Sequence, residues 1–193
     1  MKGENGSIPA FARDILQTLE GAGHEAYCVG GCVRDTLLGR TPGDWDITTS
    51  ARPEETLALF GADALPTGLR HGTVTVRRPD GSAEVTTFRR DGDYTDHRHP
   101  ESVAFTDSLT EDLARRDFTV NAMALSLRGE LRDPFHGRED LAAGRIRCVG
   151  EPARRFGEDA LRILRGLRFA AVLGFAIEPE TAAALSAARE DLR

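Results

Sequence analysis

The sequence lacks any long apolar run. No stretch approaches the roughly 20 consecutive apolar residues that a membrane-spanning helix requires. The first expected helix carries Arg13, Asp14 and Glu20, which are foreign to a secretory signal peptide. We therefore expect no membrane association and a cytoplasmic protein. The 193 residues are enough to bury a core, and they suggest one domain with an appendage.

The sequence also has few cysteines and no net positive charge. The three cysteines, Cys28, Cys32 and Cys148, are odd in number and show no C-x-x-C spacing, which excludes a disulfide framework and a paired-cysteine zinc site. We expect them to be small buried side chains. The formal net charge of −6 argues against a basic surface that coats nucleic acid. Arginines nevertheless cluster locally, at 89–90, 115–116, 154–155 and in the series 162, 165 and 168.

Periodicity and turn residues predict an α+β arrangement. The expected helices are 7–21 with Ser7 as N-cap, 32–38, 53–60, a segment within 106–125, 138–143, 158–173 and 179–189. The expected strands are 26–29, 44–48, 72–78, 83–89 and 145–149, with hairpins at 79–82 and about Gly129. A boundary near Gly150 would separate a first unit, residues 1–150, from a helical unit, residues 151–193.

Two carboxylates lie in the second expected strand, 44–48. Because side chains alternate across a strand, Asp44 and Asp46 face the same way and can ligate one divalent cation. Trp45 and Ile47 would then face the core.

A glycine pair precedes these aspartates. Gly30 and Gly31 allow the backbone to approach a ligand closely, and Arg34 falls in the first turn of the next helix, where unpaired N–H groups favour anions. With the two aspartates, this arrangement predicts a metal-bound polyphosphate.

Residues 83–102 leave two alternatives open. Glu84 shares a strand face with Thr86 and Phe88, so it is either a third carboxylate of the site or a solvent-facing side chain. Residues 91–102 form a long polar loop, which is either functional or disordered. His97 and His99 in that loop lack the rest of a metal-ligand set.

The segment from Thr106 to Leu125 begins with N-cap candidates and acidic residues, as a helix prefers. Its apolar positions would pack against the core. On a helix Asp117 and Asn121 are four residues apart and meet on one face.

The expected helix 158–173 has two sides. Leu161, Leu164, Leu167 and Phe169 would pack, while Asp159, Arg162, Arg165 and Arg168 would form a polar row. This row fits either a surface salt-bridge ladder or a base-reading surface. In the second case an aspartate accepts from an exocyclic amine and an arginine donates to a ring acceptor, which suits cytosine or adenine.

Five motifs occur together and in a fixed order over roughly residues 25–180. They are Gly30-Gly31-Cys-Val-Arg34-Asp35, Gly43-Asp44-Trp-Asp46-Ile, Glu84-Val-Thr-Thr-Phe-Arg89, Arg115-Arg116-Asp117-Phe-Thr-Val-Asn121-Ala and Glu158-Asp159-Ala-Leu-Arg162-Ile-Leu-Arg165. The set resembles the class II nucleotidyltransferases of the CCA-adding enzyme and bacterial poly(A) polymerase type. The resemblance implies a DNA polymerase β-like head, with a mixed, largely antiparallel sheet and flanking helices, followed by the start of an all-helical neck.

The resemblance also implies roles for single residues. Asp44 and Asp46 would hold two Mg²⁺ ions, with Glu84 as a candidate third catalytic carboxylate. Gly30, Gly31 and Arg34 would contact the triphosphate, and Arg116 with Asp117 the ribose region. Asp159 and Arg162 would choose CTP or ATP, with Arg165 and Arg168 supporting them or reaching phosphates. The reaction implied is transfer of CMP and AMP to the 3′ end of tRNA by a two-metal mechanism.

Several alternatives stay open on the sequence. The head also suits a poly(A) polymerase or a CC-adding or A-adding specialist, although His71-Gly-Thr-Val-Thr-Val favours the CCA-adding branch. A noncatalytic nucleotide-binding or RNA-binding module is the rival from another class. Family members continue into body and tail regions that grip tRNA, so we expect these regions C-terminal to this chain or on a partner, with weak, salt-sensitive tRNA affinity for the head alone.

Overall fold

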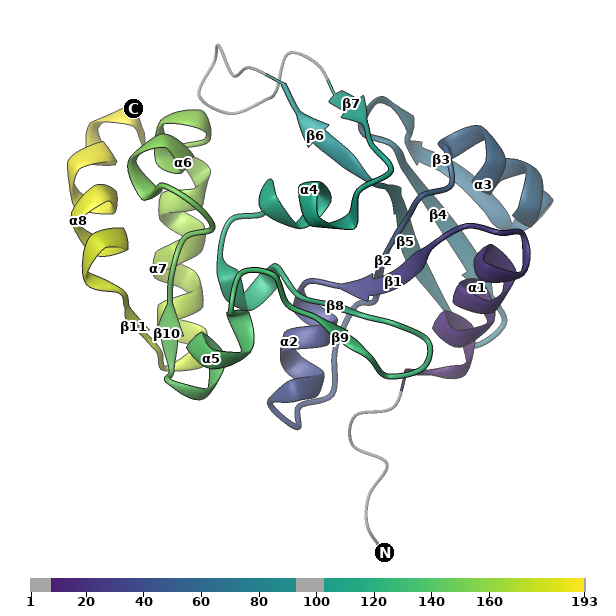
Figure 1. Ribbon diagram of the computed structural model, residues 1–193, viewed down its shortest axis with the longest axis horizontal. Helices are drawn as coiled ribbons and strands as arrows, with labels where there is room; N and C mark the ends of the chain where they lie inside the picture. Colours follow the sequence, from purple (N-terminus) through teal and green to yellow (C-terminus); the bar gives the residue numbers. More distant parts are fainter. Residues whose placement is uncertain (1–7, 93–102, 193) are drawn as a thin grey trace, which may run out of the picture.

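The computed structural model describes residues 8–92 and 103–192 (Figure 1). The expected cap at Ser7, the two loop histidines and the loop beyond Gly92 lie outside these residues. The longer helices are α1 (Ala10–Gly21), α2 (Gly31–Leu37), α3 (Pro53–Phe60), α4 (Leu109–Ala114), α5 (Gly137–Ala142), α6 (Pro152–Glu158), α7 (Leu161–Leu173) and α8 (Pro179–Ala187). Short 3-10 turns are η1 (Gly61–Asp63), η2 (Leu69–His71), η3 (Thr119–Asn121) and η4 (Ala188–Leu192).

Seven strands form the main sheet, in the order β3-β4-β5-β2-β1-β8-β9. They are β1 (Ala26–Val29), β2 (Asp46–Thr49), β3 (Ala64–Gly68), β4 (Thr73–Arg78), β5 (Gly81–Thr87), β8 (Ala124–Leu125) and β9 (Leu131–Arg132). Only the β2–β5 pair is parallel among the described pairs of this sheet. The predicted mixed, mostly antiparallel sheet with flanking helices is confirmed, as are both predicted hairpins.

The sheet has a packed face, covered by α1 and α3, and an opposite face, the functional face, on which Asp46 lies. On the packed face, α1 buries Ala12, Ile15, Leu16 and Leu19, which recur at helical spacing, and α1 and α3 cover the strands. Ile47 points into this core. Asp46 and Thr48 alternate with it and face the other side, where Thr48 Oγ1 donates to Asp112 of α4. The alternation along β2 thus aims one of the two predicted carboxylates away from the core.

Three helices gather at the other end of the molecule. Helices α6, α7 and α8 pack together on the left of Figure 1, away from α1 and α3. Strand β10 (Arg145–Ile146) pairs in parallel with β11 (Ala176–Ile177), so backbone pairing joins the two sides of the predicted boundary near Gly150. That boundary stays a prediction. A further small sheet joins β6 (Arg89–Asp91) to β7 (Val103–Phe105).

The helix expected within 106–125 is shorter than predicted. Helix α4 ends at Ala114, and Asp117 lies outside any helix. The reason is backbone competition: the Val149 N–H donates to Asp117 O and the Thr119 N–H donates to Arg147 O, so this stretch pairs with a neighbouring extended segment. Asp117 and Asn121 still meet, at 3.3 Å, through the turn η3 rather than across a helix face.

The expected helix 158–173 is also divided. Helix α6 ends at Glu158, Asp159 is extended, and α7 begins at Leu161. The predicted packing side is correct for Phe169, which is buried, but wrong for Leu161, Leu164 and Leu167, which are 40%, 50% and 48% exposed. The helix instead turns Gly166 toward Phe118, where an added Cβ would lie 3.0 Å from the ring. The buried residues of α7 are Arg162, Ile163, Gly166, Phe169 and Leu173.

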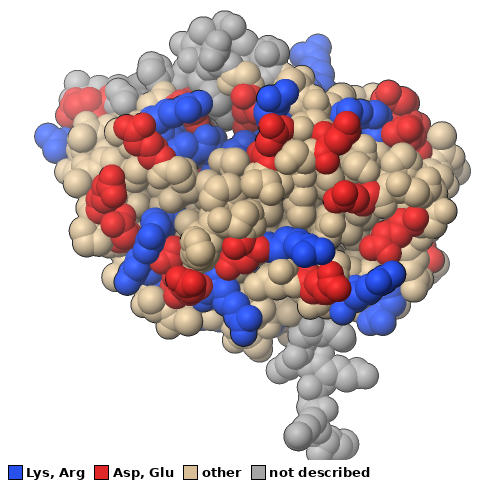
Figure 2. Space-filling model, viewed as in Figure 1, with Lys and Arg blue, Asp and Glu red and all other residues tan. Residues whose placement is uncertain are grey.

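Surface and cysteine predictions can be compared with the described residues. All three cysteines are buried and free, as predicted. No described helix is both long and apolar enough to cross a membrane. Acidic and basic side chains alternate over the face seen in Figure 2, without a broad area of one sign.

Candidate active site

A cleft of about 720 Å³ lies between the functional face of the sheet and helix α7. Its charged lining comprises seven arginines and six aspartates: Arg34, Arg89, Arg115, Arg116, Arg162, Arg165, Arg168, Asp35, Asp44, Asp46, Asp91, Asp117 and Asp159. Gly30 and Gly31 line it too. The cleft therefore brings together every site residue predicted from the sequence except Glu84.

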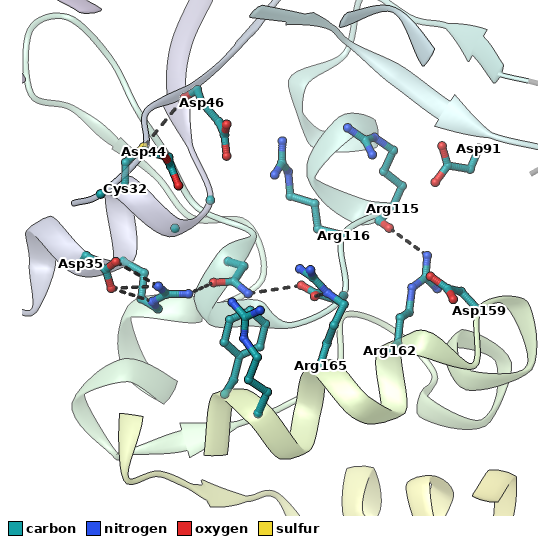
Figure 3. Close-up of a pocket in the computed structure, with 18 of the residues that line it drawn as sticks. Cys32, Asp35, Asp44, Asp46, Asp91, Arg115, Arg116, Asp159, Arg162 and Arg165 are labelled. Carbon is teal, nitrogen blue, oxygen red and sulfur yellow. Dashed lines mark hydrogen bonds and ion pairs between the residues drawn. The ribbon is translucent and has the colours of Figure 1, made fainter. Parts of the chain in front are cut away.

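Asp44 and Asp46 lie at one end of the cleft (Figure 3). Strand β2 begins at Asp46, so Asp44 precedes the strand rather than alternating within it. Burial raises the pKa of Asp46; Arg116 opposes this, and Glu84 and Asp44 raise it further. Neither carboxylate forms an ion pair with another described residue. A desolvated carboxylate beside two others gains most from a cation, so the donor set fits a divalent metal ion.

Glu84 lies on the strand next to Asp46. In the parallel pair its Cα is the direct partner of Asp46, so both side chains project from the functional face. Glu84 is exposed and does not line the cleft. Within the described residues no three His, Cys, Asp or Glu side chains form a metal-ligand group, so a third-ligand role for Glu84 stays a prediction.

Gly30 is required for a reason that the sequence did not reveal. Its φ of 79° and ψ of −131° belong to a region that side chains of L-residues avoid. A Cβ at this position would also lie 3.3 Å from Arg116 Nη1. The glycine therefore admits the Arg116 guanidinium to the end of the cleft, near Asp46.

Asp112 is an important residue that the sequence prediction missed. Its side chain is fully buried and accepts hydrogen bonds from Arg115 Nε at 2.9 Å and Arg116 Nη2 at 3.3 Å, besides the Thr48 hydroxyl. Burial alone would raise the pKa of Asp112, but Arg115 and Arg116 outweigh it and hold this pKa below its ordinary value. Its spacing of three and four residues before two arginines was the available signal.

A continuous polar chain crosses the cleft from α2 to α7. Arg34 binds Asp35 through two nitrogens, at 2.9 and 3.0 Å, and donates through Nη1 to Asn121 Oδ1 at 2.7 Å. Asn121 Nδ2 donates to Asp117, whose second oxygen accepts from Arg165 Nε at 2.7 Å. Arg34 thus turns toward Asn121 in the cleft, and three motifs that are distant in sequence share one network.

Asp159 and Arg162 lie together at the other end of the cleft (Figure 3). Arg162 is buried and donates to Glu158 Oε2 at 2.8 Å, to Arg155 O and to Arg115 O. Asp159 Oδ1 accepts from the Leu161 N–H at 2.9 Å, which leaves its other oxygen able to accept from a ligand. The polar row is not a simple surface ladder, because Arg162 and Arg165 bind acids from outside the row.

Sequence comparison matches residues 26–147, more than half of the chain, to the family described as the poly A polymerase head domain. The chain is 50% identical over 182 residues to a CCA-adding enzyme of Oceanobacillus iheyensis, covering 94% of this chain and 45% of that protein. It is 53% identical over 174 residues to a CCA-adding enzyme of Geobacillus stearothermophilus, covering 90% and 43%. The chain thus spans less than half the length of these curated relatives.

Solved structures of CCA-adding enzymes also resemble this chain. The chain matches a crystal structure of the Bacillus stearothermophilus CCA-adding enzyme in complex with CTP, with a TM-score of 0.84 and 48% identity, covering 92% of this chain and 43% of that one. It also matches a Thermotoga maritima CCA-adding enzyme complexed with tRNA, with a TM-score of 0.76 and 28% identity, covering 96% and 43%.

Proposed function

The chain belongs to the family of the poly A polymerase head domain, and from this membership we propose that it is the catalytic head of a CCA-adding tRNA nucleotidyltransferase. The substrates would be CTP, ATP and the 3′ end of tRNA. The observation that carries the proposal is that one cleft holds Asp44 and Asp46 at one end and Asp159 with Arg162 at the other. The names of the relatives favour CCA addition over poly(A) synthesis.

Asp44 and Asp46 would hold Mg²⁺, and Glu84 is the candidate for a third carboxylate. Two bound ions of this kind lower the pKa of an attacking hydroxyl and stabilise charge on a leaving pyrophosphate. The raised pKa of Asp46 supports this assignment, because metal binding would offset the cost of keeping that partly buried carboxylate ionised.

The arginines of the cleft would bind and orient the nucleotide. Arg34 and the Gly30-Gly31 turn would receive the triphosphate, and the network through Asn121 and Asp117 holds the Arg34 guanidinium in one orientation. Arg116, fixed by Asp112 beside Asp46, would neutralise charge near the reacting phosphate. No covalent enzyme intermediate is required by this arrangement.

Base choice would lie with Asp159 and Arg162. The free oxygen of Asp159 can accept from the exocyclic amine of cytosine or adenine. Arg162, held by Glu158 and two backbone carbonyls, can donate only through nitrogens that these contacts leave available. Arg165 and Arg168 would support this pair or reach phosphates. We further propose that residues 1–150 form the head and 151–193 the start of a helical neck.

The test is extension of a tRNA that lacks its CCA end, with each labelled nucleotide in turn. Addition of C and A but not G or U, lost in Asp44→Asn, is the expected result. A chain that binds CTP with Mg²⁺ but extends no tRNA, even when joined to body and tail regions from a relative, would instead be the noncatalytic binding module. Runs of A alone would identify a poly(A) polymerase.

A further inference from the structure

One aromatic ring in the cleft lies within cation–π distance of three arginines. The guanidinium carbons of Arg34 and Arg165 are both 5.3 Å from the Phe169 ring centroid, and that of Arg168 is 5.6 Å away. Arginines within about 6 Å of a ring centroid are attracted by the negative charge on the ring face. Phe169 therefore contacts guanidinium groups that come from both α2 and α7.

The ring itself is held firmly. Phe169 is only 7% exposed, and Phe118 packs edge-on against it with centroids 5.9 Å apart and an interplanar angle of 83°. Gly166, one turn before Phe169, is the close contact of α7 with Phe118. A ring fixed in this way can fix the groups that lie over it.

The charge balance around the ring leaves one arginine in excess. Arg34 is paired with Asp35, and Arg165 with Asp117. Arg168 has no ion pair or side-chain hydrogen bond with another described residue, and its guanidinium lies over the Phe169 ring. Three like charges near one ring repel each other, so their arrangement depends on both acids and on the ring face.

We propose that Phe169 is a positioning residue for nucleotide binding: its ring gathers Arg34, Arg165 and Arg168 from two helices so that they face the anionic part of the nucleotide together. Phe169 acts through the arginines and touches no reacting atom. This inference rests on the proposed function, since that function supplies the polyphosphate. A leucine at this position would keep an apolar contact but lose the charge distribution of the ring face.

The experiment measures binding of CTP and of inorganic triphosphate, each with Mg²⁺, to the full chain by isothermal titration calorimetry. Phe169→Leu should weaken both ligands by a similar factor, roughly fivefold to thirtyfold, because up to three cation–π contacts are lost. The preference for CTP over UTP should be unchanged. The dependence of triphosphate affinity on salt should become shallower, since fewer oriented cations face the ligand.

Two variants serve as controls. Phe156→Leu removes a fully buried ring that belongs to α6. No arginine lies over this ring among the described residues. The variant should lower the thermal midpoint while leaving triphosphate affinity intact. Phe169→Tyr keeps the ring face and should restore most of the lost affinity. Equal losses in Phe169→Leu and Phe156→Leu, or failure of tyrosine to do better than leucine, would overturn the proposal. Failure of the unaltered chain to bind CTP or triphosphate would overturn the proposed function as well.

Discussion

Arg165 Nε donates to Asp117 Oδ2 at 2.7 Å and thereby joins helix α7 to a turn that lies 48 residues earlier in the chain. Asp117 is nearly buried, whereas half of the Arg165 side chain is exposed. The same aspartate accepts from Asn121 and from the Phe118 N–H. This ion pair is therefore a contact between the sheet unit and the C-terminal helices, and it lies inside the candidate site.

A double-mutant cycle on Arg165→Ala and Asp117→Asn tests this contact. We expect a coupling free energy of about 1 kcal/mol, because one partner is buried and the other is partly screened by solvent. Asp117→Asn alone should cost more, since it also disturbs bonds within the turn. The measurement is urea unfolding of the four proteins. Strict additivity would show that the pair contributes nothing to holding α7 in place.

The local signals of the sequence predicted most of the secondary structure. Proline at the start of α3 and α8, and alternation in β4 and β5, located these elements well because each signal acts within a few residues. The extended segment 117–119 was missed, because its backbone partners lie about 30 residues further along the chain. The buried side of α7 was predicted correctly at Phe169 but not at the three leucines, because Arg162 and Gly166, which face inward, give no apolar signal in the sequence.

The residues that line the site were predicted better than the contacts between them. Motif order named the residues that line the cleft, but spacing along a chain does not reveal contacts between distant segments. Asp112 and Phe169 were missed for this reason: each acts through side chains of other motifs. The ion pair of Arg162 with Glu158 was missed as well, although a spacing of four residues on the expected helix was an available signal.

Asp46→Asn should separate stability from function. The amide removes the charge of a partly buried carboxyl group whose pKa is raised by desolvation, so the free energy of unfolding should stay equal or rise. Nucleotide addition should fall at least about a hundredfold, because several kcal/mol of metal-dependent stabilisation are lost. Urea unfolding and primer extension measure the two effects. Asp35→Asn, which breaks an ion pair with Arg34 instead, should not be more stable than the unaltered chain.

As the pH is lowered, metal affinity should begin to fall at a higher pH than it would for an aspartate of ordinary pKa. A proton competes with the cation for Asp46, and desolvation raises the pKa of Asp46 above its ordinary value. Binding of Mn²⁺, followed by calorimetry, should therefore weaken as pH falls through this raised pKa. The same group makes the opposite contribution to folding: its ionised form costs stability above the raised pKa, and protonation at lower pH removes that cost. An Mn²⁺ affinity that does not weaken as the pH is lowered would contradict the assignment.

Asp112→Asn should be strongly destabilising. It leaves two partly buried arginines without their shared carboxylate, at a cost of about 3–5 kcal/mol. Since the pKa of Asp112 is lowered in the folded protein, its stabilising contribution is present above the unfolded pKa and is lost as pH falls through the folded pKa. Asp107→Asn breaks an exposed pair with Arg52 and should cost at most about 1 kcal/mol. Similar unfolding curves for Asp112→Asn and Asp107→Asn would show that Asp112 has no special structural role.

Asp159 and Arg162 should respond differently to truncation although both are assigned to base choice. Asp159→Ala removes a partly exposed carboxylate that bonds one backbone N–H, so it should cost about 1 kcal/mol of stability. Arg162→Ala should cost about 3 kcal/mol or more, because Glu158 loses a buried partner and two carbonyls lose a donor. Competition among CTP, ATP, GTP and UTP should show relaxed choice in Asp159→Ala at nearly full stability. Unchanged preference in that stable variant would assign base choice to another part of the cleft, and Arg162 would then be mainly a structural residue.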